Sequence, residues 1–142
     1  MTLKATARAV PGTLVQNIEI DESHFITTDE PVTLGGSGAA PSPHELLPAA
    51  LAGCISTHLV MYARTKNWEL GDVAVAVDYD HRAAPRRFAV QIEIEAELDA
   101  EQLERVHRVA LTCPVRRALK GAALFDEEIH AGAVTSTSET VR

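Results

Sequence analysis

The chain has 142 residues, 46% of them hydrophobic, which suits one domain with a buried core and argues against disorder. Its formal net charge of −7, without a basic block, argues against nucleic acid as a partner. The longest nearly apolar run, residues 46–55, contains Pro48 and Gly53 and is too short to cross a bilayer. The N-terminal residues lack the apolar segment of a signal peptide. We therefore expect residues 1–142 to form a single domain that acts away from nucleic acids and membranes.

The N-terminal part of the sequence predicts three strands, over residues 3–10, 13–20 and 24–28, with Pro11-Gly12 and Asp21-Glu22 as turns. Residues 29–42 are rich in Gly, Ala and Pro and are typical of a loop. The glycines at 35–38 lack the Lys-Ser/Thr ending of a phosphate-binding loop. We expect them to reverse the chain and to allow close backbone approach.

A long helix is predicted to follow, because residues 42–45 (Ser-Pro-His-Glu) have the form of a capping box with proline at the first helical position. It runs to about Lys66 and is hydrophobic on most faces, which predicts a buried helix. Pro48 leaves two alternatives, a separate short first turn or a kink. Gly53 is a second possible break.

The rest of the chain alternates between strands and helices. Apolar and polar residues alternate over 73–80 and 88–96, which predicts two strands joined by a polar hairpin loop at 81–87. Asp99 is placed to cap a helix over 100–111, and Cys113-Pro114 begins a short helix that Gly121 ends. We expect a last strand over 125–133 and a frayed tail over 135–142. This order predicts an α+β fold rather than a repeated βαβ unit.

Cys54 and Cys113 are the candidate reactive residues. They are far apart in sequence and form no CxxC motif, so we expect reduced thiols in a cytoplasmic setting, either inert in the core or reactive. If the helix restarts at Gly53, Cys54 lies in the positive field of a helix start; if the helix is continuous, Cys54 is a small buried hydrophobe beyond that field. Cys113 is either an N-cap on which backbone N–H groups converge or a buried cysteine at a helix corner.

Glu45 is the third candidate, either as an ordinary capping residue or as a carboxylate that points into a site. A metal site is also conceivable from His44, Cys54, His58 and Cys113, since Cys54 and His58 share a helix face. The four residues do not form a compact cluster with the spacing of zinc ligands. We therefore expect no bound metal and no cofactor.

The segment GGSGAAPSPHELLPAALAGC at residues 35–54, followed by TCPV around Cys113, resembles the OsmC/Ohr family of peroxide-handling proteins. The resemblance covers most of the chain. It implies an OsmC-like α+β fold with antiparallel sheets around a long central helix. It also implies an intertwined homodimer with each active site at the dimer interface.

The same resemblance implies a thiol-dependent peroxidase. Cys54 would attack an organic hydroperoxide or H₂O₂, and Cys113 would then capture the Cys54 sulfenic acid as a disulfide. A dithiol reductant, possibly of the lipoyl type in its relatives, would restore both thiols. Glu45 would match the family carboxylate that orients an arginine against the thiolate.

One departure from the family pattern leaves an alternative open. In the family's peroxidases the arginine comes from the N-terminal strands or from the loop before the central helix, but residues 13–45 contain no Arg or Lys. Arg8, Arg64, Arg86 or an arginine of a second chain are the available substitutes. Without a cation, Cys54 would tend toward the inert thiol. The alternative is therefore an OsmC-like small-molecule binding protein with weak or no peroxidase activity.

Overall fold

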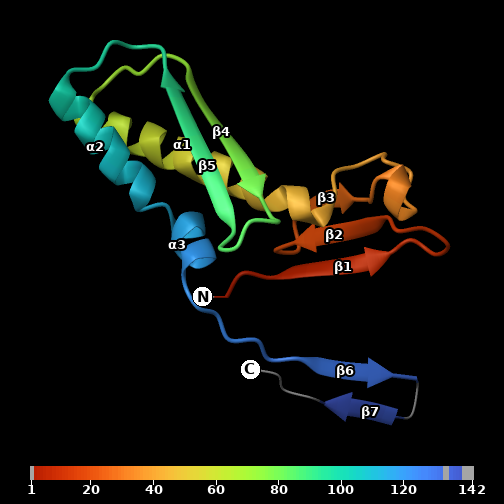
Figure 1. The fold of residues 1–142 in the computed structure, drawn as a ribbon. Coiled ribbons are helices and arrows are strands. Elements are labelled where there is room, and N and C mark those ends of the chain that lie inside the picture. Colours follow the sequence, from red (N-terminus) through yellow and green to blue (C-terminus); the bar gives the residue numbers. More distant parts are fainter. Residues whose placement is uncertain (1, 133–134, 139–142) are drawn as a thin grey trace.

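The computed structural model describes residues 2–132 and 135–138 and has the α+β order that the sequence predicts (Figure 1). Among these residues there are three antiparallel sheets, one of three strands and two of two strands, together with three α-helices and two short 3-10 helices. The elements, in chain order, are β1 (Ala5–Ala9), β2 (Gln16–Ile20), β3 (His24–Thr28), η1 (Val32–Leu34), η2 (Pro43–Glu45), α1 (Leu46–Lys66), β4 (Val73–Asp80), β5 (Arg87–Ile94), α2 (Ala100–Leu111), α3 (Pro114–Lys120), β6 (Glu128–Ala131) and β7 (Thr135–Ser138).

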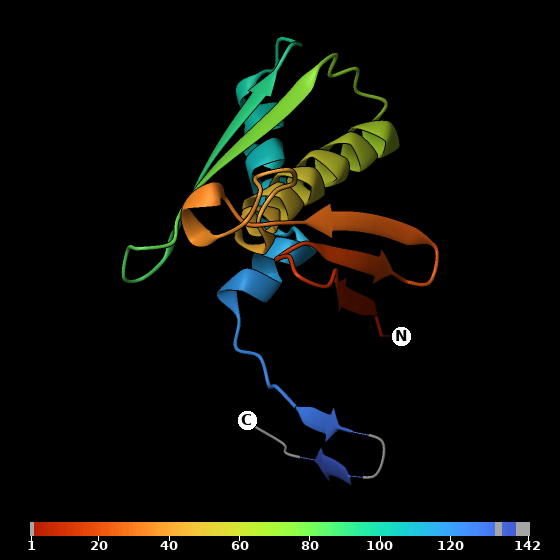
Figure 2. The ribbon, with the colours of Figure 1, turned by 90° about the vertical axis from the view of Figure 1, so that its right-hand side faces the viewer.

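The core forms around α1, which contacts β4, α2 and α3 (Figures 1 and 2). Every fourth residue of α1 is buried on one face: Leu51, Ile55, Leu59 and Ala63. The β4–β5 hairpin covers this face with the alternate side chains of β4, from Val73 to Tyr79, which are half-buried while the residues between them are exposed. This alternation confirms the two strands that the period of two predicts.

The prediction that α1 is buried on most faces is wrong for the single chain. The helix is long and apolar enough to cross a membrane by length and composition, yet only 22% of its most apolar window is buried inside the structure. Ala49, Gly53, Thr57 and Met61 lie one turn apart and are all exposed. The helix α1 therefore has two faces of small or apolar residues, and the described chain buries only one of them.

The start of α1 resolves the question posed by Pro48. A separate 3-10 turn, η2, carries the capping box of Ser42 and Glu45, and α1 begins only at Leu46. Pro48 then lies in the first turn of α1, where a missing N–H removes no intrahelical bond. Gly53 does not break the helix, which continues to Lys66 and ends at Asn67 in the left-handed conformation, with φ of 57°.

The N-terminal strands form one antiparallel sheet in the order β1-β2-β3. The third strand has its predicted bounds, but the first two are shorter than predicted. Thr13 belongs to the turn instead, because its hydroxyl donates to the Val10 carbonyl and its oxygen accepts from the Val15 N–H. Such local side-chain bonds offer the backbone an alternative to the strand ladder.

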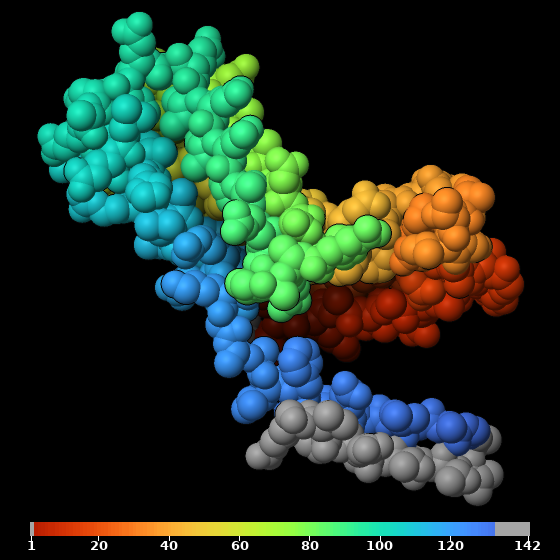
Figure 3. All heavy atoms as spheres, viewed as in Figure 1, coloured from red at the N-terminus to blue at the C-terminus, as the bar shows by residue number. Residues whose placement is uncertain are grey.

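The C-terminal part confirms α2 with its predicted bounds and Asp99 as its N-cap. The final strand is shorter than predicted, and residue 133 of that prediction lies outside the described residues. The predicted frayed tail is wrong over Thr135–Ser138, which pairs with β6 as β7, while 139–142 lie outside the described residues. The segment after α3 carries β6 away from the body of the chain (Figures 1 and 3).

Asp29 organises the glycine-rich loop that leads to α1. Its buried carboxylate accepts hydrogen bonds from the backbone N–H groups of Glu30 and Ala39 and from the backbone and hydroxyl of Ser37. The hydroxyl bond of Ser37, followed by the Glu30 N–H bond, holds the pKa of Asp29 below its ordinary value, and burial opposes this only in part. The loop closes tightly, because a Cβ at Gly36 would lie 1.9 Å from the Glu30 carbonyl oxygen.

We expect Gly36→Ala to destabilise the fold by roughly 1–3 kcal/mol, the usual cost of overpacking a site that cannot give way. The obstacle is backbone, so a change of rotamer cannot relieve it. Urea unfolding followed by circular dichroism measures the effect, with Ala39→Ser on the exposed side of the same loop as the control. A midpoint for Gly36→Ala equal to that of the wild type would contradict the close approach.

Candidate active site: a thiol pair between two helices

The structure brings Cys54 and Cys113 together between α1 and α3. Cys113 is 0% exposed and belongs to the core cluster with Leu51 and Ile55, and Cys54 packs against that cluster. Both cysteines are free thiols. Their side chains lie close enough to interact, because the Cys113 thiol raises the pKa of Cys54. Two residues that are distant in sequence therefore share one site.

Cys54 occupies an edge of α1 rather than its buried centre. It follows Leu47 by seven residues and Leu51 by three, so the three side chains share one face of the helix. Because α1 is continuous from Leu46, Cys54 lies more than two turns inside it, beyond the field of its N-terminus. Of the two alternatives for Cys54, the continuous helix is therefore present, and the restart at Gly53 is not.

The N-terminus of α3 lowers the pKa of Cys54 and does not donate a hydrogen bond to the Cys113 side chain. Cys113 is the N-cap of α3 with Pro114 at the first position, as predicted, but its side chain forms no capping hydrogen bond. Of the two alternatives for Cys113, the structure therefore has the buried cysteine and not the N-cap sulfur on which N–H groups converge. The Val115 N–H, at the second position of α3, lies near enough to the sulfur of Cys54 to lower its pKa.

The surroundings of Cys54 favour the neutral thiol. Burial raises the pKa of Cys54 above its ordinary value, and so does its interaction with Cys113, both as a hydrogen bond and as a neighbouring charge. The Val115 N–H lowers the same pKa, as a donor to a thiolate does, but less than burial raises it. No cation of the described residues contributes to the shift. The single chain thus holds Cys54 protonated at neutral pH.

Glu45 precedes Cys54 by nine residues, which is roughly 13 Å along a helix that rises 1.5 Å per residue. It therefore lies away from the thiol pair. One of its carboxylate oxygens accepts from the backbone N–H of Ser42 at 3.3 Å and from the Ser42 hydroxyl at 3.1 Å. The capping role that the sequence offered as one alternative is therefore real. Within the described part of the chain, Glu45 has no arginine as a hydrogen-bonding or ion-pair partner.

The substitute cations take different positions. Arg8 lies on the N-terminal sheet, in a shallow depression shared with Lys4, Glu19 and Asp21. Arg64 is exposed near the end of α1. Arg86 lines a cavity that shares Leu51 with the core cluster of Cys113. Arg116 and Lys120, two cations that sequence reasoning missed, line the same cavity. The spacing of Arg116 and Lys120, four residues apart in a short helix, was the available signal.

No metal site appears among His44, Cys54, His58 and Cys113. Within residues 2–132 and 135–138, no three His, Cys, Asp or Glu side chains cluster as metal ligands would. His44 instead packs edge-on against Tyr79, with ring centroids 5.8 Å apart, and lies 4.9 Å from the ring of His81. Tyr79 in turn stacks on Phe88 at 4.3 Å. This aromatic group joins η2 to the β4–β5 hairpin.

The sequence model of the OsmC-like protein family matches residues 35–128, more than half of the chain. A protein of Psychrobacter arcticus, described as an osmotic stress induced and detoxification response protein, is 32% identical; the match covers 83% of this chain and 87% of that one, with a TM-score of 0.68. An OsmC-like protein of Mycoplasma pneumoniae is 18% identical with a TM-score of 0.70, over 86% and 89% of the two chains. The chain belongs to the OsmC/Ohr family.

A third solved structure, the organic hydroperoxide resistance protein OsmC of Legionella pneumophila, is 23% identical with a TM-score of 0.60, over 85% of this chain and 90% of that one. At 18% and 23% identity, the two more distant relatives speak for the fold alone. No curated protein sequence matches the chain. The α+β fold with antiparallel strands and a long central helix is thus a family feature.

We expect Cys54 to react with iodoacetamide along a pH profile whose midpoint lies above that of an ordinary cysteine, about 8.5. Only the thiolate is alkylated, and burial with the Cys113 contact raises the pKa of Cys54. Cys113→Ala removes that contact and should move the midpoint to lower pH. Peptide mass spectrometry follows each site, and Cys113 in the wild type should stay unlabelled until unfolding because it is fully buried. A Cys54 midpoint at or below about 8 would contradict this electrostatic description.

Proposed function

We propose that the chain is a thiol-dependent peroxidase that reduces organic hydroperoxides or H₂O₂. The observation that carries the proposal is the contact of two free thiols, one half-buried and one fully buried. Among its structural relatives, proteins of Legionella pneumophila and Bacillus subtilis are described as organic hydroperoxide resistance proteins. These names support an antioxidant role in stress response.

The proposed chemistry uses both sulfur atoms. The Cys54 thiolate attacks the terminal peroxide oxygen, the O–O bond breaks, and the alcohol or water leaves with a proton, so that Cys54 becomes a sulfenic acid. The Cys113 thiol then attacks the Cys54 sulfur, water leaves, and a disulfide forms. A dithiol, such as a dihydrolipoyl group, reduces the disulfide by exchange and leaves as its own disulfide. The peroxide gains two electrons, and the dithiol loses them.

The Val115 N–H supports the choice of Cys54 as the attacking thiol, since it donates toward negative charge on that sulfur. It leaves Cys113 as the resolving thiol, held in the core until the sulfenic acid forms. For Glu45, the proposed role is to fix η2 and the start of α1 through its cap and to orient a cation supplied by a second chain. A cytoplasmic location would keep both thiols reduced between turnovers.

With dihydrolipoamide present, we expect the wild type to consume cumene hydroperoxide continuously, faster above neutral pH because more of Cys54 ionises. Cys54→Ser should abolish consumption. Cys113→Ser should stop after one equivalent, leaving a sulfenic acid that dimedone traps. A ferrous-oxidation assay with xylenol orange measures the remaining hydroperoxide. Equal rates of hydroperoxide consumption by Cys54→Ser and the wild type would contradict the proposal.

We also propose that two chains form an intertwined homodimer across the exposed face of α1. A monomer rarely leaves so much apolar surface open. Met61 on α1 is 56% exposed and Phe25 on β3 is 72% exposed. The segment that carries β6 extends from the body and could reach around a second copy (Figure 2). Other exposed large hydrophobic residues include Leu3, Val32, Leu34, Leu124, Phe125 and Ile129.

For the dimer, sedimentation velocity should give twice the 15.3 kDa mass of the chain. We expect Gly53→Arg to shift this equilibrium toward the monomer, because a buried charge without a partner opposes association. Ala74→Arg is the matched control on the exposed face of β4, where Glu93 lies opposite on β5. A wild type that sediments as a monomer at micromolar concentration would exclude the dimer.

A small-molecule binding protein is the second candidate function. A cavity of about 610 Å³ lies between α1, the β4–β5 hairpin and α3, and its volume is within the size range of ligand sites. The raised pKa of Cys54 is what a binding protein without fast thiol chemistry would show. Slow hydroperoxide consumption together with specific ligand binding would favour this function over the peroxidase.

A further inference from the structure

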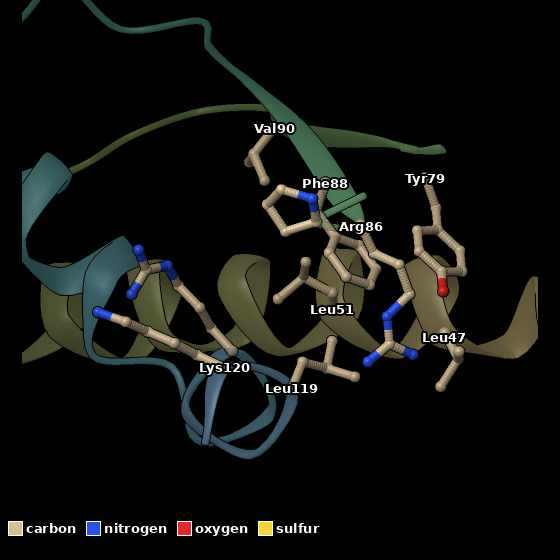
Figure 4. A pocket seen from close by; sticks show the side chains of 10 residues that line it. Leu47, Leu51, Tyr79, Arg86, Phe88, Val90, Leu119 and Lys120 are labelled. Carbon is tan, nitrogen blue, oxygen red and sulfur yellow. The ribbon is translucent and has the colours of Figure 1, made fainter. Parts of the chain in front are cut away.

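This cavity lies between the first turns of α1, the β4–β5 hairpin and α3 (Figure 4). Its apolar wall comes from Leu47 and Leu51 of α1, Phe88 and Val90 of β5, and Leu119 of α3. Leu47 and Leu51 share a helix face with Cys54, and α3 also supplies the Val115 N–H that reaches Cys54. The same two helices therefore build the cavity and the thiol pair.

Every charged side chain that lines this cavity in the described part of the chain is a cation: Arg86, Arg116 and Lys120. The whole chain carries a formal net charge of −7, so a cavity lined by three cations and no carboxylate runs against its overall charge. Among the residues that the structure describes, the ion pairs involve other side chains, and none of the three cations has a carboxylate partner. The cavity is therefore complementary to an anion.

The cations stand at two sides of the apolar wall. Arg116 and Lys120 are four residues apart on α3 and share one face of it. Arg116 is held in place by a hydrogen bond from its Nη1 to the Leu111 carbonyl at 3.3 Å. In Figure 4, Lys120 lies on one side of Leu51 and Leu119, and Arg86 lies on the other side, near Leu47. An apolar span thus separates an Arg–Lys pair from a single arginine.

We propose that this cavity binds an amphipathic organic acid, whose acidic headgroup pairs with Arg116 and Lys120 and whose apolar chain lies along Leu119, Leu51 and Phe88. Arginine beside lysine offers charge-assisted hydrogen bonds to a carboxylate or a phosphate. The apolar wall supplies the burial that a chain of several methylene groups requires. The proposal names the ligand class of the second candidate function and does not rest on the thiol chemistry.

Calorimetric titration with four ligands of equal chain length tests the headgroup: decanoate, decyl phosphate, decan-1-ol and decyltrimethylammonium. The protein is the Cys54→Ser variant, so that no thiol reaction adds heat. We expect decanoate to bind at least about tenfold more tightly than the alcohol, as the loss of a charge-assisted hydrogen bond implies. The cationic amphiphile should bind more weakly than the alcohol. Tighter binding of decyl phosphate than of decanoate would assign the headgroup to a phosphate within the same class.

Charge removal locates the headgroup. Lys120→Gln and Arg116→Gln should each weaken decanoate binding about tenfold while leaving binding of the alcohol unchanged. Arg117→Gln removes the same charge from an exposed neighbouring position that does not line the cavity, and it should leave both affinities unchanged. Lys120 is exposed, so its variant tests the idea even if Arg116→Gln unfolds the end of α2.

Equal affinity for decanoate and decan-1-ol, or an equal effect of Arg117→Gln and Lys120→Gln, would overturn the proposal. The outcome is separate from that of the peroxidase. Decanoate binding without hydroperoxide consumption would support this inference and contradict the peroxidase proposal. Hydroperoxide consumption without decanoate binding would support the peroxidase proposal alone.

Discussion

The packing of the first turn of α3 against α1 is the contact on which the candidate site depends. It buries Cys113 completely and sets its thiol beside Cys54, and it directs the Val115 N–H to the Cys54 sulfur. Pro114 suits this geometry, because the first N–H groups of a helix have no intrahelical acceptor: the one that proline lacks is not missed, and the Val115 N–H is free to face a neighbour. A shift of α3 by one turn would separate the thiols and remove the donor together.

Within one chain, the same contact does not supply the positive charge that would stabilise the Cys54 thiolate. Burial and the second thiol stabilise the neutral form of Cys54, and the single N–H donor opposes them only in part. The exposed face of α1 passes beside this thiol, at Gly53 and Thr57. A second copy on that face would deepen the burial of Cys54, so any gain in reactivity must come from a cation that arrives with it. Activation of the thiol and association of two chains are therefore coupled in our proposal.

Much of the fold could be predicted from local sequence signals. Asp99 and Ser42 identified the starts of α2 and η2, and alternating valines identified β4, because capping and strand periodicity depend on neighbours in the sequence. The continuity of α1 through Gly53 could not be predicted this way, since packing of Leu51 and Ile55 on either side holds the helix together. Local sequence likewise could not show that Val115 serves Cys54, because the acceptor lies on another helix.

The residues of the candidate site also differ in whether local sequence or only the folded structure reveals them. Cys54 and Cys113 were identified from their helix positions and from the family resemblance, and the structure brings them together. Arg116 and Lys120 were overlooked because their importance comes from the cavity they line with residues of α1 and β5. Glu45 was identified with two alternatives, of which the cap depends on Ser42 three residues away and is present.

The intact mass of the chain after one equivalent of hydroperoxide tests the central claim, that the two thiols form one reactive pair. Our account predicts a loss of two hydrogen masses, with tryptic peptides that link Cys54 to Cys113 within a single chain. A gain of oxygen on Cys54 with Cys113 still reduced would contradict it, because a resolving thiol in contact would have captured the sulfenic acid first.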